Sequence, residues 1–349
     1  MAAPVPQSPA TGPAGKPPRV LVMGAGRVGC WLGGRLQAAG AKVDFVGRPH
    51  VLQVLRQHGL TLHPPAGEAA VLAPATLRLH EALPAGRRPD LVLLCVRAGA
   101  AAEAAAALNA ALPAGTLVLA MQNGISTAEL AQQAAPDLVV LRGLVPFLIA
   151  ERAAGHLLRS GGGALAAQTH LGLLPWLPWF EAAGLPLKLQ DDLLPLQWGQ
   201  LLLNLNHAVH ALSGLPLRAQ LLDSDLRACT AGLVGETLHL MGLAGIRPAT
   251  AVPLRPALLP ATLRLPTPLF RLAGRSLLPA DAEVRGGMAI DLMRRRPTEI
   301  DAFQGDVLRL AHGLGQLAPI NARITQMVRS WSPRSLPHPG TSLRKHLGV

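Results

Sequence analysis

RVLVMGAGRVG, residues 19–29, is the stretch of sequence that decides the fold. A run of five residues, Arg19–Met23, of which four are apolar, leads directly into a Gly-x-Gly-x-x-Gly pattern at residues 24–29, and a helical pattern follows until Gly40. A second apolar run, residues 42–47, completes a strand–helix–strand unit of about 30 residues. Because the glycine pattern follows a strand and opens a helix, it predicts a dinucleotide-binding Rossmann domain.

Each glycine of this pattern has a separate physical role. Gly24 permits a tight turn, Gly26 lets the backbone approach a pyrophosphate, and Gly29 allows the helix to pack closely on the strand. The phosphates are expected at the helix N-terminus, where N–H groups and the helix dipole favour an anion. The alternative is a glycine-rich turn without a ligand. The residues expected to contact the cofactor here are Gly24, Ala25, Gly26, Arg27, Val28 and Gly29.

The end of the second strand discriminates between the two nicotinamide cofactors. An NAD enzyme usually places Asp or Glu there, whereas this chain has Gly47-Arg48-Pro49-His50. A guanidinium group pairs with a 2′-phosphate in a bidentate manner. We therefore expect NADP(H) as the cofactor, with Arg48 as a ligand; the alternative is that Arg48 is a solvated loop residue.

The length of the chain and a change in its sequence pattern near residue 190 predict two domains. Its 349 residues, half of them apolar, exceed what one core usually supports. Up to about residue 190, apolar runs alternate with Ala-rich helical stretches, which predicts a doubly wound α/β domain with a parallel sheet. The later stretches 193–213, 221–243 and 285–314 are typical of long helices and predict an all-helical C-terminal domain. The expected divisions are a disordered tail (1–17), an NADP-binding Rossmann domain (18–190), a helical substrate-binding domain (191–331) and a flexible basic tail (332–349).

Composition argues against several classes of protein. The net charge of +12 comes mainly from arginines that are scattered apart from the run 294–296. With no Tyr and five Phe, stacking aromatics are scarce, so no nucleic-acid partner is expected. Apolar stretches are too short for a membrane span, and residues 1–17 lack the apolar core of a signal peptide. The three cysteines and twelve histidines show no metal-ligand spacing. We expect a cytoplasmic protein, monomeric or homodimeric, without a metal.

Several further motifs, in order and spacing, resemble the ketopantoate reductase family. They are DLVLLCVR (90–97), MQNGI (121–125), VPFLIAERAAGHLLRSGGG (145–163), QWGQLLLNLNHAVHALSG (197–214) and RRPTEIDAFQGDV (295–307), beside GAGRVG and VGRPHV. The resemblance covers about residues 18 to 330. It implies NADPH-dependent reduction of the 2-oxo acid 2-dehydropantoate (ketopantoate) to pantoate, a step of pantothenate biosynthesis.

The resemblance also assigns roles to single residues. Arg97 stands where many members have a Lys near the cofactor, and Asn123 matches a residue that lies between cofactor and substrate. Asn204 matches an Asn that contacts the substrate, and Glu299 matches an active-site Glu beside the cofactor. The alternatives are an ordinary turn residue or helix cap for the two Asn, and a solvated helix charge for Glu299.

The catalytic position departs from the family pattern. The family helix usually has W-x-K-x-x-x-N, with the Lys as proton donor, whereas Gln200 occupies that position here and Gly287 replaces a serine. An amide donates a hydrogen bond but gives up no proton, and a lost general acid typically costs about 10²–10⁴ in rate. His207, with His210 behind it, lies near the helical face of Gln200 and Asn204, so we consider it as a replacement donor; the alternative is a satisfied core or surface histidine. Lys188 is a second candidate, and its alternative is an exposed side chain in a strand-like run.

Three functions remain open from the sequence. The first is reduction of 2-dehydropantoate, and the second is reduction of a different 2-oxo acid. The third is a non-catalytic, NADP(H)-binding paralogue, which the absence of the lysine would permit. A hydroxyacyl-CoA type of dehydrogenase is disfavoured by the Q-N-G segment followed by T-E-I-D.

Overall fold

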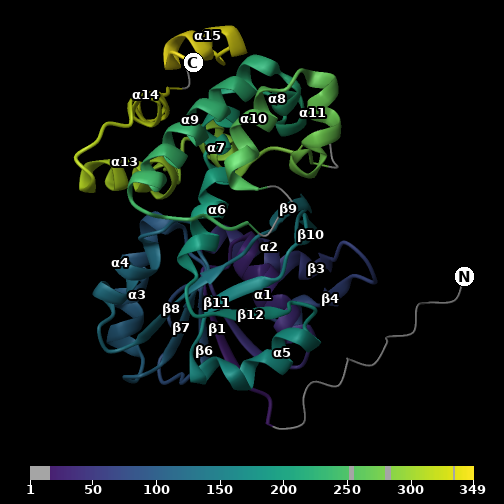
Figure 1. The fold of residues 1–349 in the computed structure, drawn as a ribbon. Helices are drawn as coiled ribbons and strands as arrows, with labels where there is room; N and C mark the ends of the chain where they lie inside the picture. The colour runs from purple at the N-terminus through teal and green to yellow at the C-terminus, as the bar shows by residue number, and fades with distance from the viewer. Residues whose placement is uncertain (1–15, 251–254, 280–283, 333–334) are drawn as a thin grey trace, which may run out of the picture. The chain divides into compact units, whose positions relative to one another are not determined.

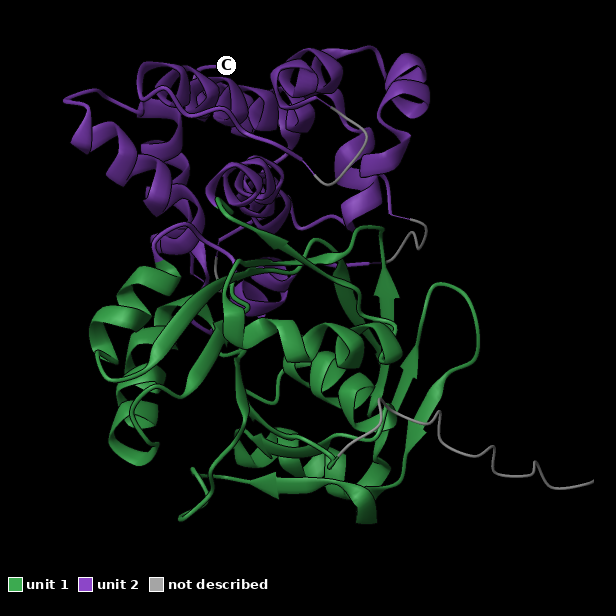
Figure 2. Cartoon of the chain, turned by 60° about the horizontal axis from the view of Figure 1, so that its bottom comes forward, with its two compact units in different colours: residues 1–122, 127–193 green, residues 123–126, 194–349 purple. Residues whose placement is uncertain are grey.

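The computed structural model describes residues 16–250, 255–279, 284–332 and 335–349, shown in Figure 1. The chain forms two compact units, coloured separately in Figure 2. Unit 1 contains residues 1–122 and 127–193, and unit 2 contains residues 123–126 and 194–349. The tail predicted for residues 1–17 lies almost entirely outside the described residues.

Unit 1 is built on an eight-stranded sheet in the order β12-β11-β8-β7-β6-β1-β2-β5. All neighbouring strands are parallel except β8 and β11, which confirms the predicted parallel-dominated Rossmann fold. The strands are β1 (Arg19–Met23), β2 (Lys42–Val46), β5 (Arg78–His80), β6 (Leu91–Leu94), β7 (Leu117–Ala120), β8 (Val139–Leu144), β11 (Leu165–Gln168) and β12 (Leu187–Gln190).

Both faces of this sheet are buried, because successive side chains of its strands point into different cores. On β2, Val43 and Phe45 face the core that contains Trp31 of α1, whereas Val46 faces the core that contains Leu108 of α3. Helices therefore cover both faces, as Figure 1 shows. The helices of unit 1 are α1 (Arg27–Ala38), α2 (Pro49–His58), α3 (Ala101–Ala111), α4 (Thr127–Ala134) and α5 (Leu177–Ala182).

A second, four-stranded sheet was not predicted from the sequence. Its order is β4-β3-β10-β9, with β3 (Leu60–His63), β4 (Ala70–Leu72), β9 (Leu148–Ala153) and β10 (His156–Ser160). It packs on α1, where Leu60 and Leu62 join the α1 core and a Cβ at Gly34 would lie 2.8 Å from Leu62 Cδ1. A side chain at residue 34 would therefore force Leu62 to shift within the buried core.

The regular elements of unit 2 are helices, with no strand among its described residues, as predicted. Its helices are α6 (Leu194–Asn204), α7 (Asn206–Ser213), α8 (Leu217–Leu222), α9 (Ser224–Leu243), α10 (Leu259–Arg264), α11 (Thr267–Ala273), α12 (Gly287–Met293), α13 (Ile300–Gly313), α14 (Pro319–Arg329) and α15 (Gly340–Leu347). The three long predicted helices are each divided. One division has a clear cause: Asp223 accepts the N–H groups of Asp225 and Leu226 at 2.9 Å and so begins a new helix, α9.

The prediction of a flexible tail at residues 332–349 was wrong for residues 340–347. These residues form α15, which packs on α9 with Leu343 and Leu347 fully buried. Arg344 Nη1 donates to Asp225 Oδ1 at 2.9 Å, and Gly340 lies against Asp223. Two apolar side chains at a helical spacing therefore order a segment whose composition is basic.

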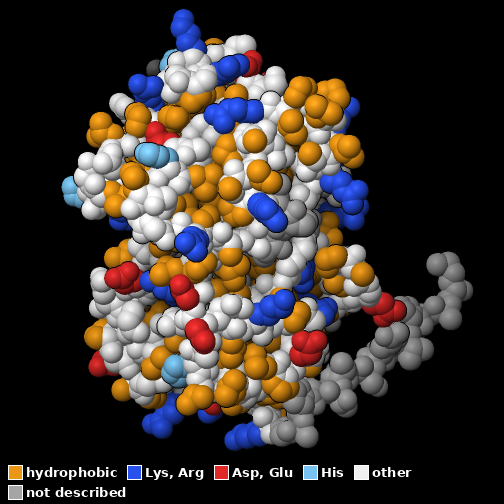
Figure 3. Space-filling model, in the orientation of Figure 1, with side chains coloured by type: hydrophobic (Ala, Val, Ile, Leu, Met, Phe, Trp, Pro, Cys, Tyr) orange, Lys and Arg blue, Asp and Glu red, His pale blue; other side chains and the backbone are white. Residues whose placement is uncertain are grey.

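The described residues contain no helix long and apolar enough to cross a membrane and no cluster of three or more metal-ligating side chains. On the face drawn in Figure 3, Lys and Arg side chains are dispersed among apolar and acidic ones. Cys30, Cys95 and Cys229 are free, and burial raises the pKa of the Cys30 and Cys229 thiols to about 12. The two thiols are therefore protonated and unreactive near neutral pH.

Candidate functional site

The glycine turn of unit 1 is anchored to both neighbours of β1. The N–H groups of Gly24 and Ala25 donate to the carbonyl of Val46, at the end of β2, at 3.0 and 2.8 Å. On the other side, a Cβ at Gly24 would lie 2.5 Å from the backbone nitrogen of Val96, which follows β6. Gly24 also has a φ of 111°, a conformation that other residues rarely adopt. Only glycine fits at this position.

The other two glycines of the pattern have opposite surroundings. A Cβ at Gly29 would lie 2.1 Å from the carbonyl oxygen of Gly24, so the start of α1 is in direct backbone contact with the turn. A Cβ at Gly26 would meet no described atom within 4 Å, and Gly26 is exposed. The backbone at Gly26 therefore has open space on the side where a side chain would otherwise stand.

The N-terminus of α1 fits an anionic group. Gly26 precedes the helix and has no side chain with which to cap it, and the first turn contains no acidic residue. The N–H groups of a first helical turn have no partner within the helix, and the helix dipole adds positive potential there. The turn and the helix start thus form a backbone cradle of the type that holds a dinucleotide's phosphates.

Two arginines follow the strands on either side of this cradle. Arg48 is exposed, lies two residues after β2 and immediately precedes α2. A Cβ at Gly47 would lie 2.6 Å from Ala25 Cβ, so the chain that leads to Arg48 passes directly against the glycine turn. Arg97 is half-buried and follows Val96, the residue that contacts Gly24.

In unit 2, Gln200 and Asn204 lie one turn apart on α6. The Gln200 amide nitrogen donates to Asn204 Oδ1 at 3.2 Å, and Asn204 is 5% exposed while Gln200 is half-buried. Because the oxygen of the Asn204 amide accepts this bond, its NH₂ group, which can only donate, points away from Gln200. Gly199 lies against the backbone of Ala249, where an added Cβ would collide with the carbonyl oxygen at 1.7 Å. The helix that carries the pair is therefore held by close backbone packing.

His207 is a poor proton donor in this structure. Its ring stacks on Phe303 with 5.5 Å between ring centroids, and burial lowers its pKa to about 4. His210 is fully buried, accepts the N–H of Gly286 at 3.0 Å, and its pKa is also lowered to about 4, chiefly by burial. With a pKa near 4, about one His207 side chain in a thousand is protonated at pH 7. The hypothesis that His207 replaces the missing lysine is therefore disfavoured. Lys188 is exposed on β12 in unit 1.

Helix α13 brings two predicted segments together. Glu299 is half-buried and immediately precedes the helix, while the loop that contains Asn123 is bonded to Asp306, about two turns further along. Asp306 accepts the N–H of Ile125 and the hydroxyl of Ser126. Asp306 and Ser126 were not predicted as site residues. The sequence signal for Asp306 was weak, an acidic residue between Gly305 and Val307 in a helical stretch that also contains Asp301 and Arg309, and Ser126 had none.

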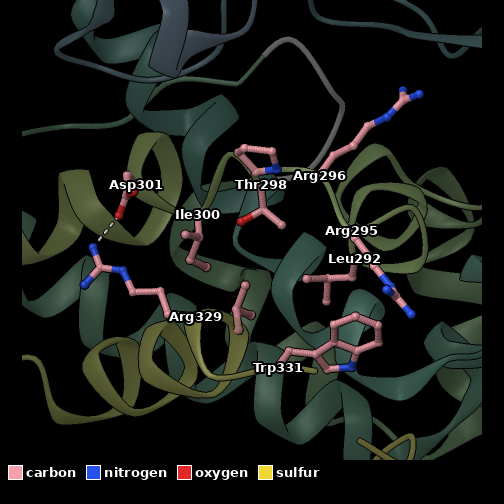
Figure 4. Close-up of a pocket in the computed structure, with 10 residues that line it drawn as sticks. Leu292, Arg295, Arg296, Thr298, Ile300, Asp301, Arg329 and Trp331 are labelled. Carbon is pink, nitrogen blue, oxygen red and sulfur yellow. Dashed lines mark hydrogen bonds and ion pairs between the residues drawn. The ribbon is translucent and has the colours of Figure 1, made fainter. Parts of the chain in front are cut away.

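A pocket of about 510 Å³ lies where α12, α13 and α14 approach one another (Figure 4). None of the predicted site residues lines it, although Thr298 and Ile300, the neighbours of Glu299, do. Asp301 and Arg329 form an ion pair at its edge. Its lining residues are Leu292, Arg295, Arg296, Pro297, Thr298, Ile300, Asp301, Val328, Arg329 and Trp331.

The family follows from comparison of the whole chain with known proteins. Residues 20–172 match the family model described as ketopantoate reductase PanE/ApbA, and residues 192–331 match the model of its C-terminal part. The chain belongs to the ketopantoate reductase family. Apart from residues 123–126, the residues that match the first model lie in unit 1, and nearly all of those that match the second lie in unit 2.

Individual relatives agree with this family. A 2-dehydropantoate 2-reductase from Halobacterium salinarum is 31% identical over 147 residues, which span 42% of this chain and 47% of that protein, about half of its length. The crystal structure of a PanE/ApbA family ketopantoate reductase from Ralstonia eutropha JMP134 is 26% identical, with a TM-score of 0.73 over 89% of this chain and 97% of that one. A D-mandelate dehydrogenase with NADH and anilino(oxo)acetate shares the fold, with a TM-score of 0.72 at 17% identity over 95% of this chain and all of that one.

Replacing His207 with Gln is expected to leave the pH dependence of kcat unchanged between pH 6 and pH 8. A group with a pKa of about 4 loses its proton as the pH rises through 4, so its protonated fraction falls about tenfold per pH unit across this range. A reaction that required this proton would slow by the same factor. The measurement is NADPH oxidation with saturating 2-oxo acid, and the exposed His239→Gln is the control. A tenfold slope in the wild type that is absent from His207→Gln would contradict this expectation.

Proposed function

We propose that this chain is an NADPH-dependent reductase of 2-oxo acids and that 2-dehydropantoate, reduced to pantoate, is its substrate. The observation that supports the cofactor most directly is Arg48, an arginine where NAD enzymes carry an acid, on a connection that packs against the glycine turn. Family membership supports the reaction class.

Unit 1 supplies the residues for the cofactor. The N–H groups at the start of α1, beside Gly26, would hold the pyrophosphate, and the Arg48 guanidinium would form bidentate bonds to the 2′-phosphate. Arg97 adds positive charge on the other side of the turn. NADPH, when bound, supplies the hydride; the protein's residues orient the reactants and stabilise charge.

Unit 2 supplies the residues for the substrate. The Asn204 NH₂ group, oriented by its bond from Gln200, would donate to an oxygen of the 2-oxo acid, and Asn123 and Glu299 would complete the binding of substrate and cofactor. The Gln200 amide would stabilise negative charge that develops on the carbonyl oxygen, but it has no proton to give. Water would then supply the proton, and the reaction would be slower than one with an ammonium group at this position.

A second candidate function is supported by the same glutamine. A chain that keeps the cradle, Arg48 and Asn204 but lacks the proton donor could bind NADP(H) without significant turnover. It could also reduce a different 2-oxo acid, one whose reduction depends less on general acid catalysis. Restoring the lysine separates these functions from the leading one.

Gln200→Lys is expected to raise kcat for 2-dehydropantoate by about 100-fold or more, because the ammonium group both stabilises and protonates the developing alkoxide. The measurement is NADPH oxidation with 2-dehydropantoate and with a panel of other 2-oxo acids, for both proteins. Gln200→Met, of similar length but without a donor, is the matched control and should lower kcat further. If Gln200→Lys gains nothing on 2-dehydropantoate but gains on another 2-oxo acid, the substrate proposed here is wrong. No turnover by either protein on the panel would support the non-catalytic paralogue.

Arg48→Gln is expected to weaken NADPH binding about 10- to 100-fold, the range for losing charge-assisted hydrogen bonds to one phosphate. NADH, which lacks the 2′-phosphate, should bind equally well to both proteins. The measurement is titration by nicotinamide fluorescence. Arg56→Gln removes one charge from the other end of α2 and serves as the control. Equal losses for NADPH and NADH would exclude a specific role for Arg48 at the 2′-phosphate.

A further inference from the structure

The buried carboxylate of Asp306 joins two segments that are far apart in the sequence. Its side chain is 3% exposed, and its Oδ2 accepts the backbone N–H of Ile125 at 2.6 Å. Its Oδ1 accepts the Ser126 hydroxyl at 2.8 Å and the Arg309 guanidinium at 2.6 and 3.2 Å. A carboxylate so deeply buried requires partners of this kind, and Arg309 supplies the opposite charge from the same helix.

Arg309 also bonds to Ser126 and to the first turn of α13. Its Nη2 also donates to the Ser126 hydroxyl at 3.1 Å and to the backbone carbonyl of Asp301 at 2.9 Å. Asp306, Arg309 and Ser126 thus contact one another pairwise. The loop of residues 123–126 is consequently fixed to α13 through both a backbone N–H and a side chain.

The turn that is fixed in this way begins at Asn123. Gly124, the next residue, has a φ of 104° and no side chain to restrict its backbone, so the turn has little rigidity of its own. The two bonds to Asp306 start directly after it, at Ile125 and Ser126. They therefore set the path of the backbone within two residues of Asn123.

We propose that Asp306 is a positioning residue, which holds the Asn123 amide in the orientation that the reaction requires. The inference rests on the proposed function, in which Asn123 binds substrate and cofactor. Asp306 itself contacts neither. Because small displacements of a binding group reduce rates strongly, loosening this loop should lower kcat more than it raises KM.

The first test follows the loop itself and needs no turnover. Asp306→Asn retains the size of the side chain but removes its charge, and it is expected to speed hydrogen exchange of the Ile125 amide in the free protein at least tenfold. Glu236→Gln is the matched control, because Glu236 also accepts two backbone N–H groups of a neighbouring segment, those of Ile320 and Asn321, at 2.9 Å. It should leave exchange in residues 121–126 unchanged. Unchanged exchange at Ile125 in Asp306→Asn would overturn the proposal.

The second test is a double-mutant cycle with Asn123→Ala, read as kcat and KM for NADPH oxidation with the best substrate of the wild type or of Gln200→Lys. If Asp306 acts through Asn123, each single variant lowers kcat about 10- to 100-fold and the double variant is no worse than Asn123→Ala alone. If the kcat losses of the two single variants multiply in the double variant, Asp306 has a general structural role and the proposal is overturned. Faster exchange at Ile125, together with a wild-type protein that binds no NADPH, would instead show that the proposed function, and not the anchoring of the loop, has failed.

Discussion

The Val46 carbonyl accepts the N–H groups of both Gly24 and Ala25, and this pair of bonds is the constraint on which the candidate cofactor site depends. It ties the glycine turn to the end of β2, while the missing Cβ of Gly24 lets the turn rest on the residues after β6. The same packing places the backbone that leads to Arg48 and to Arg97, because Gly47 lies against Ala25 and Val96 lies against Gly24. A parallel sheet with both faces buried is rigid enough to hold such a turn without a ligand.

Carboxylates perform a comparable task in the helical unit. Asp223 begins α9, Glu236 accepts the first N–H groups of α14, and Asp306 holds the loop that contains Asn123. In each case a carboxylate accepts backbone N–H groups and so fixes the start of a helix or the path of a loop. Helical packing alone leaves loops free to move, so the placement of single functional side chains depends on these polar contacts.

The sequence predicts the β1–turn–α1–β2 unit well because its signals are local: an apolar run, three glycines and a helical stop within 30 residues. It does not predict the four-stranded sheet, whose strands are short and pack on α1. It also does not predict α15, a helix in a basic segment that two buried leucines hold in place. The spacing of residues in the sequence placed His207 near Gln200 and Asn204 and so made it a candidate acid. The burial that lowers its pKa to about 4 depends on the tertiary structure, which the spacing does not give. Asp306 was missed for the same reason, since Ile125 and Ser126, the loop residues that it holds, lie about 180 residues away in the sequence.

The central claim is that a backbone cradle at residues 24–29, together with Arg48, binds the phosphates of NADP(H). Calorimetric titration of the purified wild-type chain with NADPH and with NADH tests it most directly. We expect one NADPH bound per chain, at least tenfold more tightly than NADH. Absence of heat with both nucleotides, or tighter binding of NADH, would contradict it.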